Sequence, residues 1–152
     1  MRKNKDIIKI YFTTKQFLYI FSLSILLVSC GEQQKEKGVS DNNIDAARNF
    51  IRAALDGKFR EAKDFMVKDS LNLNYLEVVE RAYQNVDPST KDSFKGASIQ
   101  ILNTNEVNDS VSIIIYENSF KKDPDTLKVV KQKDEWLVDL KYLYLHDADS
   151  TK

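Results

Sequence analysis

The sequence predicts an α+β domain in which N-terminal helices pack on a curved antiparallel sheet of about four strands. Between residues 43 and 85, apolar residues recur three and four positions apart, which is the spacing of amphipathic helices. Beyond residue 97 apolar and polar residues alternate, as in β-strands. Short turn segments separate these alternating runs, and strands joined by short loops pair with their neighbours.

The first helix is predicted over residues 44–56, where the apolar residues form one stripe. Asn42 can cap its start, with Asp45 three residues later in a pattern like a capping box. Gly57 suits the left-handed conformation that ends a helix. These signals place both ends of the helix.

Two more helical segments follow. A short helix is expected over residues 59–66, and a third begins at Asp69 or Ser70 and runs to about Asn85. Residues 85–93 are then predicted to be a loop, because Pro88 disfavours helical backbone at Asp87 and lacks a backbone donor.

The strand region begins with alternation over residues 97–102, and residues 103–109 supply a predicted turn. Residues 111–116 are apolar on both faces, which is typical of a central strand. Asp123, Pro124 and Asp125 break the chain, and a further strand leads to a tight turn at Lys133 and Asp134.

The last strand is predicted to place Trp136, Val138, Leu140, Tyr142 and Tyr144 on one face. The domain is therefore expected to span residues 43–146, followed by a polar tail over residues 147–152.

A basic leader precedes an apolar run of about 12 residues at positions 17–28, which fits a secretory signal and is too short to span a membrane. Leu27, Val28, Ser29 and Cys30 resemble the lipobox of bacterial lipoproteins. The resemblance implies that residues 1–29 are a signal peptide, that the chain is cut before Cys30, and that Cys30 carries the lipid. Two acyl chains suffice for stable anchoring. An ordinary secreted protein is the alternative.

Residues 30–42 are polar and lack apolar periodicity, so we expect a flexible tether. The residue after Cys30 is Gly31, which by resemblance to Gram-negative sorting rules favours the outer membrane over the inner one. Whether the domain faces the periplasm or the cell surface is left open.

The composition excludes several classes of function. The full chain has 23 basic and 23 acidic residues, and the leader holds five of the basic and one of the acidic residues, so the mature chain would have a net charge of about −4. A chain with this net negative charge lacks the positive surface that binds nucleic acid. Cys30 is the only cysteine and His146 the only histidine, so we expect no disulfide, no cysteine or histidine-rich metal site and no cofactor. His146 is expected to be exposed.

Three segments together are similar to small bacterial lipoproteins with a nuclear-transport-factor-2-like (cystatin-like) domain. They are the helix at residues 47–57, the short helix at residues 59–65, and the closing strand at residues 133–139 with its Trp136. The resemblance covers roughly residues 43–142 and implies the cone-shaped fold. The shared patterns concern packing, and no catalytic residue carries over, because His146 lies beyond the centre of the last strand.

Aromatic side chains are the candidate site residues, since ligand pockets are mostly apolar. Trp136, Tyr142 and Tyr144 follow one another at period two and, with Tyr83 and Tyr116, are candidates to line a pocket between sheet and helices. The alternative is that these side chains fill the core. The acidic residues of the turns are read as solvated: Asp123, Asp125, Asp134 and Glu135. Asp139, on the strand face opposite Trp136, is expected to be exposed.

Three functions remain open from the sequence. The first is an envelope lipoprotein that binds a small apolar ligand or a partner protein without catalysis. The second is an enzyme of the same fold that uses carboxylate and tyrosine chemistry, and the third is a purely structural interaction module. A dry cavity favours the first, a cavity with convergent polar groups favours the second, and a filled cone with an exposed apolar patch favours the third.

Overall fold

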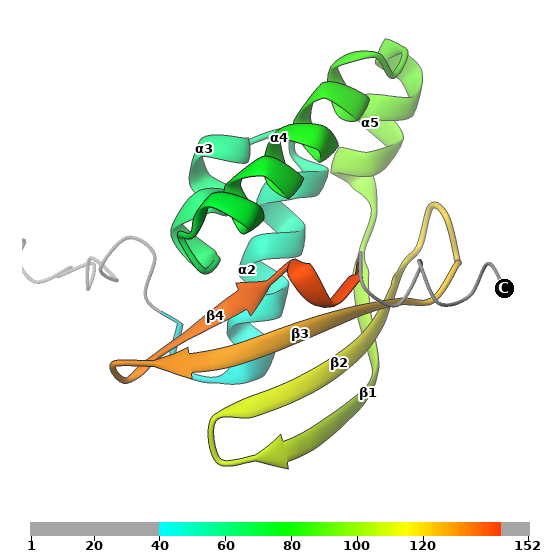
Figure 1. The fold of residues 1–152 in the computed structure, drawn as a ribbon. Helices are drawn as coiled ribbons and strands as arrows, with labels where there is room; N and C mark the ends of the chain where they lie inside the picture. The colour runs from blue at the N-terminus through cyan, green and yellow to red at the C-terminus, as the bar shows by residue number, and fades with distance from the viewer. Residues whose placement is uncertain (1–39, 144–152) are drawn as a thin grey trace, which may run out of the picture. The chain divides into compact units, whose positions relative to one another are not determined.

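The computed structural model describes residues 40–143, which lie within one compact unit of the chain, Lys35–Lys152. Helices come first and a four-stranded antiparallel sheet follows, which confirms the predicted α+β class (Figure 1). The predicted signal peptide, the lipidation of Cys30, the tether up to residue 39, Tyr144, His146 and the polar tail lie outside the described residues. Among residues 40–143, no helix has both the length and the apolar character needed to cross a membrane.

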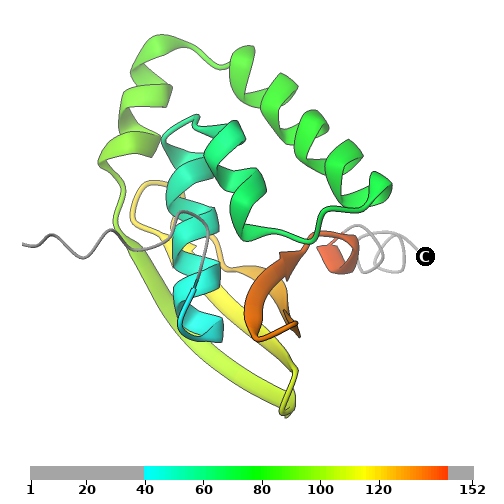
Figure 2. The same cartoon turned by 90° about the vertical axis from the view of Figure 1, so that its left-hand side faces the viewer.

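Helix α2 (Asn43–Leu55) begins and ends where the sequence predicts. The Asn42 side chain accepts a hydrogen bond from the backbone N–H of Asp45 at 2.9 Å, which satisfies one of the free donors of the first turn. Gly57 follows the helix with φ +73°, a conformation that costs glycine little. The apolar stripe of α2 lies in the core shared with the sheet, and the helix contacts all four strands. Figure 2 shows α2 lying against the sheet.

The next two helical segments also match the prediction. The short helix consists of α3 (Phe59–Ala62) and a 3₁₀ turn, η2 (Lys63–Phe65). Helix α4 (Ser70–Gln84) starts after Asp69, whose side chain accepts a hydrogen bond from the backbone N–H of Asn72. Only Asn72 and Leu76 of this helix are fully buried, so α4 is attached mainly through its N-terminal half.

The loop predicted over residues 85–93 is wrong, because helix α5 (Pro88–Gly96) occupies most of it. Pro88 is the first residue of α5, where a missing backbone N–H costs nothing. Asp87 caps the helix by accepting hydrogen bonds from the hydroxyls of Ser89 and Thr90 and from the Thr90 backbone N–H. These hydrogen bonds hold the pKa of Asp87 well below its usual value, and the bond from Ser89 has the largest effect.

The turn predicted over residues 103–109 is also wrong, because strand β1 (Ile99–Asn108) runs through it and the chain reverses only at Asp109 and Ser110. β1 is an edge strand with mostly exposed side chains, so polar residues that suggest a turn are tolerated there. Irregularities in its pairing with β2 occur between Ile101 and Asn103 and between Glu106 and Asn108.

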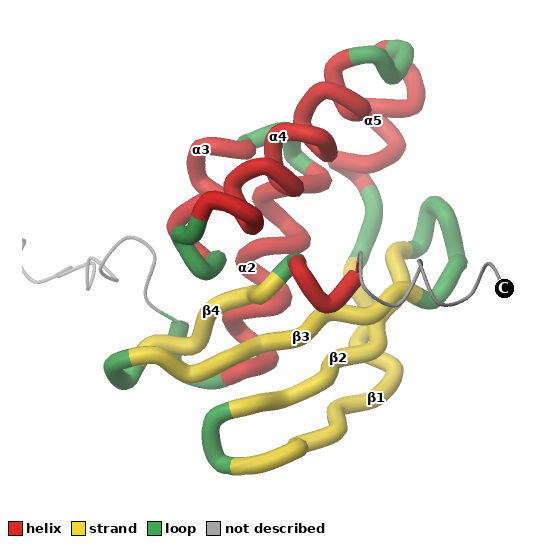
Figure 3. Tube along the Cα trace, in the orientation of Figure 1, coloured by secondary structure: helices red, strands yellow, loops and turns green. Residues whose placement is uncertain are grey.

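The rest of the sheet follows the predicted meander, β1-β2-β3-β4 (Figure 3). β2 (Val111–Asn118) and β3 (Asp125–Gln132) are its central strands, as predicted for the first of them. Lys133 and Asp134 form the tight turn to β4 (Glu135–Asp139), and both have positive φ angles, 49° and 69°. The inner face of the sheet and the helices share one core, whose largest fully buried apolar members are Met66, Ile114, Leu127, Val129 and Val138.

β4 ends earlier than predicted, because residues 141–143 form a helical turn instead of a strand. The backbone N–H of Leu140 donates to Asn72 Oδ1 at 2.7 Å, and that of Lys141 donates to Asp139 Oδ1 at 3.3 Å. Side chains therefore take the backbone donors that a longer strand would pair. Tyr142 consequently does not continue the inward-facing row of Trp136 and Val138.

Candidate functional site

A pocket of about 430 Å³ lies between the helices and the sheet. Its volume is within the usual range for small-molecule sites, which are mostly apolar with a few polar groups. The floor is formed by apolar side chains of α2 and β3, chiefly Phe50, Ile51, Leu55 and Leu127. Leu140 and Leu143 line the pocket from the segment that follows β4.

The helical hairpin of α4 and α5 supplies an aromatic wall. Tyr83 of α4 contacts Phe59 edge to face, with ring centroids 5.5 Å apart, and Phe94 of α5 at 6.2 Å. Phe94 in turn contacts Phe120 edge to face at 5.2 Å. Such pairs contribute stabilisation beyond the area they bury, so the wall is held by its own ring contacts. Val79, Ala82 and Val86 complete this side.

Two polar side chains hold this wall in position. The Tyr83 hydroxyl donates to the backbone oxygen of Leu55 at 3.4 Å. The Arg52 guanidinium donates to the backbone oxygens of Ala97 at 2.7 Å and Phe94 at 3.1 Å, and it pairs with Asp56 at 2.8 Å. Since no residue of α5 is fully buried, Arg52 is a main tether of that helix to α2.

The opposite wall brings polar groups to the rim. Tyr116 of β2 extends its hydroxyl to Asp125 Oδ2 at the start of β3, and the two oxygen atoms are 3.2 Å apart. Burial, followed by the charge of Asp125, raises the pKa of Tyr116 well above its ordinary value, so the hydroxyl keeps its proton. Asn118, Lys121 and Asp123 line the same side.

The structure brings together some of the residues that the sequence singled out. Tyr83 and Tyr116 both line the pocket, from opposite walls. Trp136 packs against the core from β4, and neither Trp136 nor Tyr142 lines the pocket. Tyr144 lies outside the described residues. The four turn carboxylates are exposed as expected, but Asp123 and Asp125 also border the pocket.

Sequence reasoning missed Phe94 and Arg52. Phe94 lies on the helix that was predicted as a loop, although Asp87 before Pro88 is a recognisable start signal for a helix. Arg52 looks like one more charged residue on the wet face of α2. Only the placement of α5 shows that its guanidinium caps two carbonyl groups.

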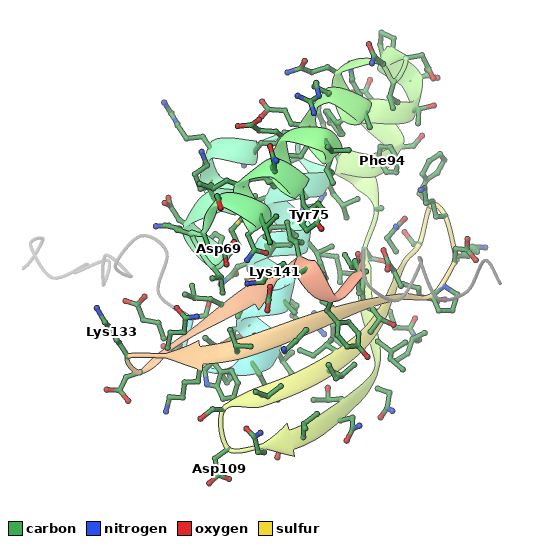
Figure 4. The ribbon with its side chains drawn as sticks, in the orientation of Figure 1. Asp69, Tyr75, Phe94, Asp109, Lys133 and Lys141 are labelled. Atoms are coloured by element: carbon green, nitrogen blue, oxygen red, sulfur yellow. The ribbon has the colours of Figure 1, made fainter. Side chains whose placement is uncertain are left out.

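The expectation that Asp139 is exposed is wrong, because only 9% of this residue is accessible. Its carboxylate accepts a hydrogen bond from Asn72 Nδ2 at 3.2 Å and lies 3.7 Å from Lys141 Nζ and 3.9 Å from Lys128 Nζ. Asn72 Nδ2 also donates to Asp69, which pairs with Lys141 at 2.7 Å (Figure 4). The start of α4 covers the end of β4 and removes Asp139 from solvent.

This second cluster has the properties of a structural junction. Both lysines pair with carboxylates, and every polar atom of Asn72 is used. Within residues 40–143, no group of three or more histidine, cysteine, aspartate or glutamate side chains is arranged to hold a metal ion. The pocket, and not this junction, is therefore the candidate functional site.

Comparison with known proteins found no family model, no curated sequence and no solved structure that matches this chain.

Proposed function

We propose that this protein is a lipid-anchored component of a bacterial envelope, and that its domain binds a small apolar ligand between the helical hairpin and the sheet. The observation that carries the proposal is the apolar pocket of about 430 Å³ with aromatic side chains on both walls. Concave sites of this volume with a mostly apolar lining are typical of small-molecule binding.

The proposed anchor rests on the sequence. Cys30 ends an apolar run behind a basic leader, and a dually acylated cysteine would hold the domain at its membrane. The outer membrane is the proposed location, with the domain in the periplasm or at the cell surface. The likeness to lipoproteins with a nuclear-transport-factor-2-like domain supports the same reading, and the order of helices and strands is compatible with it.

A substitution that fills the pocket tests ligand binding. Ala82 is an exposed residue of α4 that lines the pocket, whereas Val78 on the same helix is exposed and does not. With the full-length chain in phosphatidylcholine vesicles, equilibrium dialysis of 4-phenylbutanol should show saturable binding over protein-free vesicles. We expect Ala82→Trp to weaken it at least about tenfold and Val78→Trp to leave it within about twofold. Equal effects of the two variants would refute the pocket as the binding site.

The anchor has its own test. Cells expressing the chain are grown with labelled palmitate, and the label is expected on the wild-type chain and not on Cys30→Ser. Label that persists on Cys30→Ser would contradict lipidation at Cys30, and it would leave the pocket proposal untouched.

A second candidate is an enzyme, because the Tyr116 hydroxyl and the Asp125 carboxylate meet at the pocket. We favour binding because Asp125 is exposed to water, while catalytic carboxylates act best in water-excluded sites. Tyr116→Phe separates the two. A binding protein purified from its natural host retains the same small molecules with either chain, whereas an enzyme accumulates unconverted substrate on the variant. Mass spectrometry of the extracted molecules shows which occurs.

A further inference from the structure

We infer that the ligand of this pocket is a cationic amphiphile, with an apolar body between the walls and a protonated amine at the rim beside Asp123 and Asp125. The inference rests on the proposed function and adds the chemical class of the ligand. It comes from three features of the rim: its charge, its hydrogen-bonding groups and its aromatic rings.

The charges of the rim favour a cation. Asp123 and Asp125 line the pocket together with a single basic residue, Lys121, so the lining has one excess negative charge. Among the described residues, Asp123 has no hydrogen-bond or ion-pair partner, so its charge is available to a ligand. An anionic head group in the same place would face two carboxylates, and like charges at close range oppose binding.

The hydrogen-bonding groups of this wall are mainly acceptors. The Tyr116 proton is already donated to Asp125 Oδ2, so the Tyr116 oxygen offers a lone pair to a ligand. Asp125 Oδ1 accepts from the backbone N–H of Thr126 at 2.7 Å, and an ionised carboxylate has further acceptor sites and no donor. An ammonium group has three donors and no acceptor, which complements these atoms.

The aromatic wall already interacts with ammonium groups. Lys121 Nζ lies 6.0 Å from the ring centroid of Phe94, and Lys91 Nζ lies 5.6 Å from that of Tyr83. Both rings line the pocket, and the negative face of an aromatic ring attracts cations. A ligand ammonium group that displaces Lys121 at the rim would meet the Phe94 ring in its place.

Three ligands with one apolar body separate the head groups: 4-phenylbutylamine, 4-phenylbutanol and 4-phenylbutanoate. Equilibrium dialysis with the full-length chain in phosphatidylcholine vesicles, against protein-free vesicles at pH 7, gives each affinity. We expect the amine to bind at least about tenfold more tightly than the carboxylate, with the alcohol between them.

The double variant Asp123→Asn/Asp125→Asn should abolish most of the preference for the amine over the carboxylate. The matched control is Asp109→Asn/Asp134→Asn, which makes the same charge change at two exposed turns that do not line the pocket and should preserve the preference. All four residues are exposed, and asparagine keeps the size of the aspartate side chain at each position.

The possible results distinguish the inference about the ligand's head group from the proposal that the pocket binds a ligand. Suppose that Ala82→Trp removes binding of the alcohol but the amine binds no more tightly than the carboxylate. This result overturns the inference of a cationic ligand and preserves the proposed pocket. An amine preference that falls equally in both double variants also overturns it, since the effect would then be that of net charge. If none of the three ligands responds to Ala82→Trp, the proposed function itself fails.

Discussion

The side chain of Asn72 accepts a hydrogen bond from the backbone N–H of Leu140 at 2.7 Å, across 68 positions of the chain. Asn72 is fully buried, and its amide group also donates to Asp139 and Asp69. One side chain at the start of α4 thus satisfies the first backbone donor beyond β4 and a buried carboxylate. Besides Asn72, only Leu76 of α4 is fully buried.

Replacing Asn72 by alanine should lower the free energy of unfolding by about 2–4 kcal/mol, because it leaves the Leu140 N–H without an acceptor and removes one donor from the buried Asp139 carboxylate. Asn74→Ala is the matched control, since Asn74 lies on the exposed face of the same helix. Urea denaturation followed by circular dichroism measures both variants. Equal losses would mean that helix propensity, and not the junction, accounts for the effect.

Asp69 should make stability depend on pH in the acid range. Hydrogen bonds from the Asn72 backbone and from Lys141 lower the pKa of Asp69 from 3.8 to about 2. A lowered pKa stabilises the fold fully above the unfolded value, and the contribution disappears as the pH falls from about 4 to about 2. The same contact raises the pKa of Lys141, so its contribution persists at neutral pH and disappears only in strong alkali.

The Asp69→Asn variant should therefore show a flatter decline of the urea midpoint between pH 4 and pH 2 than the wild-type chain. Asparagine is also a good N-cap, so the variant removes the charge and retains the cap. Asp109→Asn, at the β1–β2 turn away from α4 (Figure 4), should decline as steeply as the wild type. A decline in Asp69→Asn as steep as in the wild type would show that other carboxylates dominate.

Gly57 and Tyr83 approach so closely that a Cβ on Gly57 would lie 2.6 Å from Tyr83 Cε1. Gly57→Ala combines this clash with a positive φ, and we expect a loss of about 2–4 kcal/mol in the free energy of unfolding. Gly96→Ala is the control, because nothing lies within 4 Å of its Cβ position, and it should be neutral or stabilising by up to about 1 kcal/mol.

A double variant separates the two causes. In a Tyr83→Ala background the clash is absent, so adding Gly57→Ala should cost only the strain of the left-handed backbone, about 1–2 kcal/mol. If the cost of Gly57→Ala is the same with and without the Tyr83 ring, the contact does not determine the position of the pocket wall.

Local signals predicted the elements whose ends they mark. Asn42 and Gly57 bound α2, and Asp69 begins α4, because capping acts within a few residues. The two wrong assignments arose where one residue type fits two conformations. Proline both excludes a helix interior and starts a helix, and the polar residues of β1 suit an exposed edge strand as well as a turn.

The site was predictable only in part, because it depends on contacts between distant segments. Tyr83 and Tyr116 were recognised as aromatic residues of a predicted helix and a predicted strand. Their companion Phe94 depended on an unrecognised helix, and the exclusion of Trp136 depends on how β4 lies along the sheet. The burial of Asp139 is likewise invisible to alternation, since a side chain from α4 reaches over the strand and covers it.

Trp136 and Phe94 should respond oppositely to truncation, and this comparison distinguishes core from pocket wall. Trp136 packs on the core without lining the pocket, so Trp136→Ala should lower the free energy of unfolding by about 2–4 kcal/mol. Its affinity for 4-phenylbutanol should stay within about twofold of wild type. Phe94 lies on a helix without fully buried residues, so Phe94→Ala should cost about 1–2 kcal/mol and weaken binding several-fold. Loss of binding in a folded Trp136→Ala chain would instead place the ligand against β4, and the pocket between α5 and the sheet would then not be the site.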